Sequence, residues 1–195
     1  MKRYTTTFAG LVALALLALG LSFIPACSST YPRRDPTGET FPTVRGESLA
    51  GDDVELPAIA AGQPLLLLIG YDQDAQFDID RWLLGLTQAE VGVRMLELPT
   101  IPGMFPRMFS GTIDGGMRRG IPREDWGGVV TLYADAEPVA QFTGNADGLT
   151  GRVVLLDGEG RVRFFHDRGY SVGSLQRLSS TLHELSQESR GERGE

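Results

Sequence analysis

Residues Pro64–Trp82, "PLLLLIGYDQDAQFDIDRW", contain the change of pattern that decides the fold. The run Leu65–Ile69 does not alternate with polar residues, which is typical of a strand buried on both faces. A polar turn follows, and from Asp78 onward apolar residues recur at helical spacing. We therefore predict a central strand, a turn at its carboxyl end, and a helix that packs back on the sheet.

The rest of the chain predicts an α/β fold with a central mixed sheet flanked by helices. Alternating runs around Thr43–Val44 and Val54–Leu56 predict an N-terminal hairpin. "VGVRMLELP" and "GGVVTLYAD" predict two further strands, and "GRVVLLDGEGRVRFF" predicts a late hairpin. Strands joined through helices build a parallel sheet, to which the late hairpin adds antiparallel strands. A C-terminal helix is predicted from the spacing of Leu175, Leu178, Leu182 and Leu185.

A second helix is predicted in "FPRMFSGTIDGGMRRGIP", although Gly115 and Gly116 weaken it. Its large apolar residues fall on roughly one side of the helix. These residues are Phe105, Met108, Phe109, Ile113 and Met117.

The first residues predict a secretory signal. A basic leader precedes the apolar run Phe8–Ile24, and "IPAC" follows with the only cysteine, Cys27. "IPAC" resembles a bacterial lipobox, in which the cysteine is lipidated; the alternative is an uncleaved anchor helix. Because Ser28 follows the cysteine, we expect by default an outer-membrane anchor facing the periplasm. We divide the chain into a signal peptide (1–26), a flexible tether from the lipidated cysteine (27–40), one domain (41–186) and a disordered tail (187–195).

Charge and cysteine content exclude several functions. The net charge of −7 argues against a nucleic-acid partner, because phosphate binding needs a basic face. If Cys27 carries lipid, the mature domain has no thiol for a disulfide, for thiolate catalysis or for a cysteine metal site. His166 and His183 lie too far apart in sequence for a metal motif. We expect no metal, no cofactor and no catalytic residue, and we exclude thiol–disulfide oxidoreductase and peroxidase activity.

Several segments resemble known proteins. "FPTVRGESLAGDDVELPAIAAGQPLLLLIGY" and "VVLLDGEGRVRFF" resemble the first strands and the late hairpin of membrane-tethered thioredoxin-like proteins and alkyl-hydroperoxide-reductase relatives. The resemblance implies a thioredoxin-like fold over most of 41–185. Catalytic members carry a cysteine pair that would begin near Asp74–Gln76 and a cis-proline that would fall near Gly151, and this chain has neither.

The chain is more similar to one thioredoxin-like family, that of the mitochondrial ATP synthase assembly factors and their bacterial lipoprotein relatives. The segments that carry this resemblance are "GYDQDAQFDIDRWLLGL", "GMRRGIP", "VVTLYAD" and "FTG…RVVLLDGEGRV". Members of that family help a membrane complex to assemble and are not regarded as thiol enzymes. The resemblance therefore implies a role in assembly.

A candidate binding surface follows the predicted central strand. In open α/β sheets ligands bind outside the carboxyl ends of the strands. Glutamine amides suit the recognition of backbone groups, and an arginine pair suits a carboxylate or a lipid phosphate. The alternatives are a solvated turn with helix caps, and arginines that complement a helix dipole. The candidate residues are Tyr71, Asp72, Gln73, Asp74, Gln76, Arg81, Arg118 and Arg119.

These observations favour a membrane-anchored, non-catalytic binding or assembly module of the cell envelope, with a membrane or envelope protein as its partner. The missing cysteines and the lack of an acid–base constellation argue against an enzyme. The alternatives are a cysteine-independent enzyme and a small-ligand carrier. A flat, arginine-edged surface at Tyr71–Gln76 would support assembly, whereas a pocket with shifted carboxylates would favour the alternatives.

Overall fold

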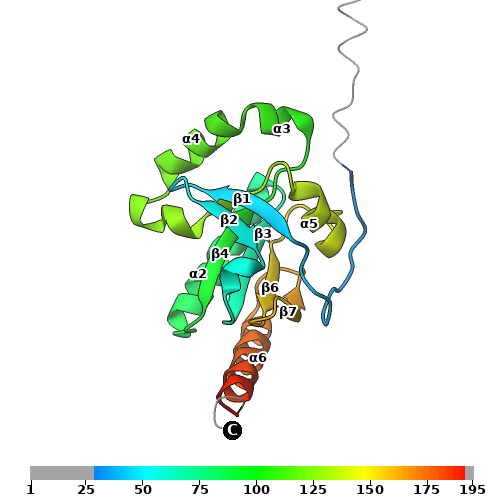
Figure 1. The fold of residues 1–195 in the computed structure, drawn as a ribbon, viewed down its shortest axis with the longest axis vertical. Coiled ribbons are helices and arrows are strands. Elements are labelled where there is room, and N and C mark those ends of the chain that lie inside the picture. The colour runs from blue at the N-terminus through cyan, green and yellow to red at the C-terminus, as the bar shows by residue number, and fades with distance from the viewer. Residues whose placement is uncertain (1–28, 192–195) are drawn as a thin grey trace, which may run out of the picture.

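The computed structural model describes residues 29–191 (Figure 1). The predicted signal peptide, the lipidation of Cys27 and residues 192–195 of the predicted tail lie outside the described residues. Within 29–191 the predicted α/β architecture is confirmed, with a mixed sheet and helices on both of its faces.

In residues 29–191 seven strands form two sheets, in the orders β2-β1-β5 and β4-β3-β6-β7. Isolated parallel bridges, Glu97–Val129 and Thr100–Leu132, join β4 to the β5 segment. β3 pairs in parallel with β4 and antiparallel with β6, so both predicted hairpins and the mixed sheet are present. The strands are β1 (Val44–Ser48), β2 (Asp53–Leu56), β3 (Leu65–Gly70), β4 (Arg94–Pro99), β5 (Val130–Thr131), β6 (Arg152–Leu156) and β7 (Val162–His166).

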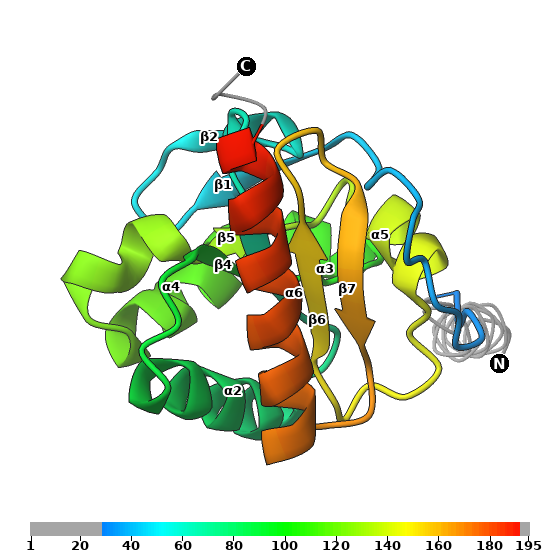
Figure 2. The same ribbon diagram turned by 90° about the horizontal axis from the view of Figure 1, so that it is seen from below.

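The central strand β3 separates two hydrophobic clusters. Its residues from Leu65 to Ile69 are fully buried, as the unalternating sequence predicts. Leu66 and Leu68 pack with residues of α2 and α6 on one face, while the other face packs with the β1–β2 hairpin and α5. Figure 2 shows α2 and α6 side by side. The helices are α2 (Gln76–Gln88), α3 (Met104–Met108), α4 (Ser110–Gly120), α5 (Ala136–Thr143) and α6 (Val172–Gly191), with 3-10 turns η1 (Ala58–Ala60), η2 (Gln73–Ala75) and η3 (Arg123–Gly128).

The described part of the predicted tether, 29–40, lies against the domain instead of extending from it. The Tyr31 amide donates to the Asn145 side chain (2.7 Å), and Arg33 forms an ion pair with Asp147 (2.7 Å). The Gly38 amide donates to the Val162 carbonyl (2.8 Å). The segment is held there because its polar groups are satisfied by the domain.

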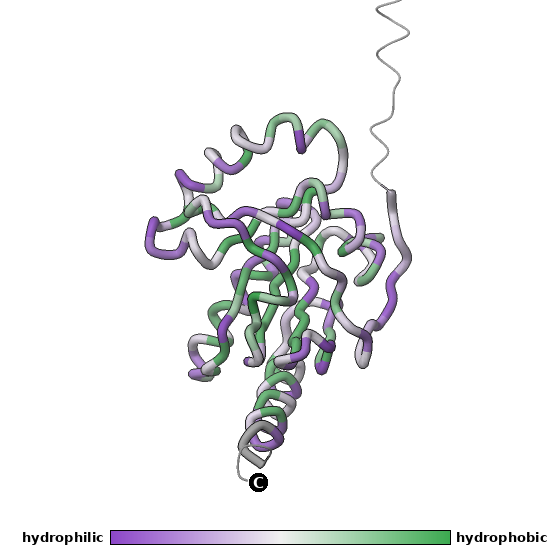
Figure 3. The backbone as a smooth tube through the Cα atoms, in the orientation of Figure 1, coloured by the Kyte–Doolittle hydropathy of each residue, from purple (hydrophilic) through white to green (hydrophobic). Residues whose placement is uncertain are grey.

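The predicted second helix is two short helices, α3 and α4. Phe105, Met108 and Phe109 are exposed and do not face the core. Ile113 and Met117, on α4, line a cleft instead. The apolar positions visible in α3 in Figure 3 therefore do not belong to either core cluster.

Two helices also differ from the sequence prediction, one by its presence and one by its length. The short helix α5 was not predicted; its Pro138 lies in the first turn, where a proline is tolerated because the missing amide has no helical partner. Helix α6 continues to Gly191, past the predicted domain boundary at 186. The chain therefore has an additional helix before β6 and a longer one at its C-terminal end.

Candidate functional site

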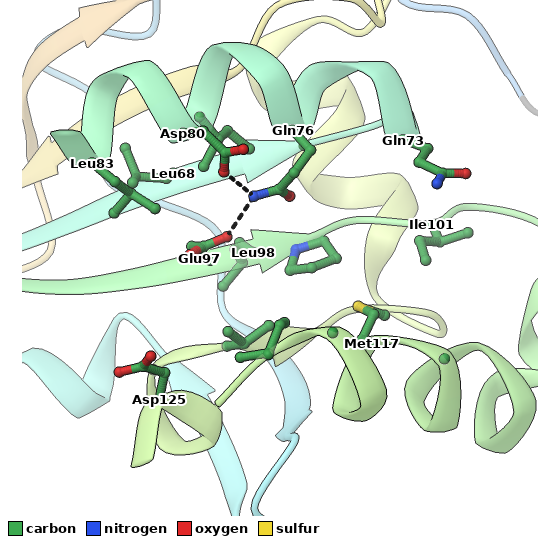
Figure 4. A pocket seen from close by; sticks show the side chains of 18 of the residues that line it. Leu68, Gln73, Gln76, Asp80, Leu83, Glu97, Leu98, Ile101, Met117 and Asp125 are labelled. Atoms are coloured by element: carbon green, nitrogen blue, oxygen red, sulfur yellow. Dashed lines mark hydrogen bonds between the residues drawn. The ribbon is translucent and has the colours of Figure 1, made fainter. Parts of the chain in front are cut away.

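A cleft of about 1250 Å³ opens at the carboxyl end of the parallel pair β3–β4. Figure 4 shows α2 along one wall, α4 and η3 along the other, and β4 between them. The chain turns sharply after β3 because Asp72 caps η2, its carboxylate accepting from the Asp74 amide (3.0 Å). This turn brings the first residues of α2 over the end of the sheet.

Three polar side chains meet in the middle of the cleft. The Gln76 side-chain amide donates to the carboxylate of Asp80 (2.9 Å) and to that of Glu97 (3.3 Å), as Figure 4 shows. Gln76 and Asp80 share a helix face because they are four residues apart, and Glu97 reaches them from β4. One amide thus holds two carboxylates that would otherwise repel each other.

The pKa of the Glu97 carboxyl group in the cleft is raised. Burial raises its pKa, and the nearby carboxylates of Asp80 and Asp125 raise it further, while the hydrogen bond from Gln76 acts in the opposite direction. Glu97 therefore holds its proton to a higher pH than an exposed glutamate does. A cation bound beside it would reverse this effect.

The charged residues that line the cleft are all acidic. None of the described residues that line the cleft is Lys, Arg or His. Large apolar side chains on α2, β4 and α4 provide the rest of the surface, among them Leu83, Met95 and Ile113. An apolar ligand that carries positive charge therefore matches this lining in both respects. The acidic lining residues are Asp72, Asp80, Glu97, Glu124 and Asp125.

The structure divides the eight predicted site residues into two groups. Tyr71, Asp72, Gln73 and Gln76 line the cleft, whereas Asp74, Arg81, Arg118 and Arg119 are not part of its lining.

The predicted arginines have other positions. Arg81 donates to the Phe77 carbonyl of its own helix (3.0 Å). Arg118 donates to the Leu49 carbonyl (2.8 Å), with its guanidinium 5.8 Å from the centre of the Trp126 ring. Arg119 is exposed near the end of α4. The site is therefore a concave acidic cleft and not a flat surface edged by arginines.

Tyr71 is fixed at the back of the cleft by a buried arginine. The Tyr71 hydroxyl hydrogen-bonds with Thr143 (2.6 Å), and the Arg152 guanidinium lies 5.5 Å from the ring centre. Arg152 is fully buried and donates to three backbone carbonyls of the 144–150 loop, those of Gly144, Asp147 and Thr150. Burial lowers the pKa of Arg152 and raises that of Tyr71. This arrangement makes the end wall of the site rigid.

Sequence reasoning missed the acidic residues of the cleft. Glu97 alternates with Leu96 and Leu98 in "RMLELP", which places it on the opposite face of β4 from these two core leucines. Asp80 lies one turn beyond Gln76, on the same helix face. Both signals were present in the sequence. Asp125 and Glu124 have no such pattern, because only the return of the chain through η3 brings them to the cleft.

Solved structures share this fold. The thioredoxin domain of a thiol–disulfide oxidoreductase from Bacteroides vulgatus is 14% identical, with a TM-score of 0.51 over 76% of this chain and 99% of that one. A thiol peroxidase from Chromobacterium violaceum is 11% identical, with a TM-score of 0.51 over 82% and 93%. A SCO1/SenC family lipoprotein from Bacillus anthracis is 9% identical, with a TM-score of 0.54 over 80% and 99%.

At these identities the likeness defines the fold, and the chain has the predicted thioredoxin-like α/β fold. Comparison with protein-family models finds no match, and comparison with curated protein sequences finds none either. In the part of the chain that the structure describes, no helix is both long enough and apolar enough to cross a membrane.

The prediction that the chain is not an enzyme is contradicted by these comparisons. The neighbours include a thiol–disulfide oxidoreductase and a thiol peroxidase, so the fold is one that redox enzymes use. The prediction took the missing cysteines and the lack of an acid–base constellation as evidence against catalysis, and neither the fold nor the cleft supports that step. A perturbed carboxylate in a cleft is a feature of catalytic sites as well as of binding sites.

Proposed function

We propose that the chain is a membrane-tethered binding protein of the cell envelope, which takes an extended, basic and partly apolar peptide segment into the α2–α4 cleft. The observation that carries this proposal is the lining of the cleft, which combines five carboxylates and large apolar side chains with no basic residue among the described positions. By the criterion set out from the sequence, a pocket with a shifted carboxylate favours an enzyme or a small-ligand carrier over a flat assembly surface, and both of these bind a ligand in the pocket.

The size of the cleft favours a peptide over a small molecule. Small-ligand pockets are typically about 300–1,000 Å³, and this cleft is about 1250 Å³. The amides of Gln73 and Gln76 offer both donors and acceptors for peptide groups. A lysine or arginine of the segment would lie between Asp80, Glu97 and Asp125, where its charge replaces the repulsion among the carboxylates with attraction.

The location in the envelope follows from the sequence and is part of the proposal. The basic leader, the apolar run Phe8–Ile24 and Cys27 support a lipid anchor, and we place it in the outer membrane facing the periplasm. One solved structure with the same fold is itself described as a lipoprotein. We retain the relation to the ATP synthase assembly factors as a prediction, supported by the quoted sequence segments.

Crosslinking in native membranes tests the binding role. Benzoylphenylalanine replaces Ile113, which lines the cleft, and mass spectrometry identifies the crosslinked peptide. We expect a segment with net positive charge and apolar residues, and at least a tenfold lower yield when Asp80→Asn and Asp125→Asn are combined, because both carboxylates lie beside Glu97.

Two control variants make the result specific. Benzoylphenylalanine at Leu84, exposed on α2 and outside the cleft lining, should not capture the segment. Asp74→Asn removes a nearby carboxylate that does not line the cleft and should leave the yield unchanged. An acidic captured segment, or equal capture by the double variant, would disprove the proposal.

The second candidate function is catalysis on the bound ligand, and the raised pKa of Glu97 favours it. A carboxylic acid that keeps its proton in a partly buried cleft is suited to general-acid chemistry. In that case the wild-type protein would release a chemically altered segment, and Glu97→Gln would capture the same segment without altering it. An unaltered segment from the wild-type protein would leave binding as the function.

A further inference from the structure

Helix α3 presents a cluster of large apolar side chains to solvent. Met104, Phe105, Met108 and Phe109 are between 57% and 78% exposed, and we call this set the apolar α3 face. None of the four lines the cleft or joins a core cluster. Contiguous exposed apolar surface of this kind marks a site of interaction rather than a gap in the core.

The position of this face relative to the N-terminal segment indicates what covers it. Figure 1 shows α3 at the same end of the long axis as the first described residues, with α6 at the opposite end. Cys27 precedes Ser29 by two residues, which span at most about 7 Å of extended chain. A lipid on Cys27 would therefore keep a bilayer beside the end of the domain that carries α3.

The charge within the segment that contains α3 also suits a lipid surface. Arg107 is the only charged residue between Ile101 and Ile113, in a chain whose net charge is −7. It is exposed, and its aliphatic stem lets the guanidinium reach phosphate headgroups while neighbouring apolar side chains enter the acyl boundary. Asp114, the nearest carboxylate in sequence, is buried and accepts from the Tyr133 hydroxyl (2.7 Å).

We infer that the apolar α3 face inserts into the headgroup region of the bilayer, with Arg107 at the phosphate level. The domain is then held to the membrane at two points, the N-terminal lipid and α3. The second attachment fixes its orientation relative to the bilayer. This inference rests on the proposed tether and is independent of the ligand in the cleft.

Labelling from within the bilayer tests the inference with the full chain. The lipoprotein is reconstituted in vesicles of phosphatidylcholine and phosphatidylglycerol that contain a phosphatidylcholine with a diazirine on its acyl chain. After irradiation, mass spectrometry locates the labelled peptides. We expect label on the peptide that contains Met104–Phe109, and at least a fivefold loss of that label in a Phe105→Ser, Phe109→Ser variant.

Leu84→Ser is the matched control, because Leu84 is 58% exposed and Phe105 is 57% exposed. It should leave the labelling of α3 unchanged. Near-ultraviolet circular dichroism checks that each variant is folded, and if the double variant does not fold, the wild-type labelling pattern alone decides.

The pattern of labels separates this inference from the tether. Label on the N-terminal peptide alone would overturn the α3 contact and leave the tether intact. Label on α3 alone would support the contact and contradict the tether. Label on neither would overturn both.

Discussion

The two helical walls of the cleft are attached to the domain in different ways. Helix α2 buries Ile79, Trp82 and Leu86 against the sheet. Helix α4, of similar length, buries only one residue, Asp114. The cleft therefore combines a wall that belongs to the core with a wall that is only loosely packed. Ligand binding can reposition the second wall at little cost because few apolar contacts hold it in place.

The first prediction compares one apolar side chain from each helical wall, Trp82 on α2 and Met117 on α4. Trp82→Ala should lower the free energy of unfolding by about 3–5 kcal/mol, because it leaves a large cavity in the core. The indole is fully buried and packs edge-on to His166 and Tyr170. Met117→Ala on α4 should cost less than about 1 kcal/mol, since its side chain is only partly buried. Urea unfolding compares the two, and similar costs would show that α4 is also part of the core.

The second prediction concerns the one buried carboxylate on each wall. Asp78 accepts from the backbone amides of Tyr170 (2.7 Å) and Gly151 (3.1 Å), one through each oxygen. Asp78→Ala leaves both amides without that partner and should cost about 2–3 kcal/mol. Asp78→Asn keeps one acceptor oxygen and should cost about half as much. Asp114→Ala on α4 removes one hydrogen bond, to Tyr133, and should cost about 1 kcal/mol. Equal costs for the two alanine variants in urea unfolding would contradict the comparison.

In the third prediction, the same substitution changes the stability of the protein in opposite directions on the two walls. A Cβ at Gly85 in α2 would lie 2.6 Å from the Tyr170 ring, so Gly85→Ala should destabilise the protein by about 1–3 kcal/mol. At Gly115 in α4 the nearest atom would be 4.0 Å away, and it belongs to a flexible arginine. Gly115→Ala should therefore stabilise the protein by about 0.5–1 kcal/mol through helix propensity. Thermal unfolding of both variants tests this, and a loss of stability at Gly115 would mean that α4 is packed more tightly than its contacts indicate.

The contrast between a helix packed on the sheet and a loosely packed one also explains how much of the fold the sequence could predict. The spacing of Ile79, Trp82 and Leu86 predicted α2 correctly because those residues are spaced for one buried helix face. The same spacing at Phe105 and Phe109 does not mark a buried face. An apolar pattern shows that a surface avoids water, and it does not show which partner covers that surface. A helix that packs on its own sheet and a helix that meets an external partner look alike in sequence.

The candidate site shows a similar limit. The position of the site was predictable, since the turn after Ile69 lies at the carboxyl end of a central strand. The acidic character of the site was not predictable. Asp125 comes to the cleft from η3, more than forty residues after Gln76 in the chain. Arg118 was misjudged for the opposite reason, since its side chain turns to the Leu49 carbonyl and away from the cleft.

The last and smallest expected effect concerns the pKa of Glu97, which carboxylates from both walls of the cleft raise. Its folded-state pKa is raised, so between the pKa of the unfolded chain and that of the folded protein the folded state binds more protons. Stability attributable to Glu97 therefore falls as the pH rises through that window, which begins near the ordinary glutamate value of about 4.3. The Glu97→Gln variant does not lose this stability as the pH rises. It should therefore be more stable than the wild-type protein at pH 7, by less than about 1 kcal/mol, and this gain should vanish below pH 4.

Thermal unfolding of Glu97→Gln and wild-type protein between pH 4 and pH 8 measures this difference. Asp80→Asn removes one of the charges that raise the pKa of Glu97. In the Asp80→Asn background, the pH range over which the Glu97→Gln variant and its parent differ in stability should therefore be narrower. A difference that stays constant with pH would show that the Glu97 carboxylate is not perturbed. With a basic segment in the cleft, the added cation favours the ionised carboxylate from both walls at once, so the same comparison on the loaded protein should show a weaker pH dependence.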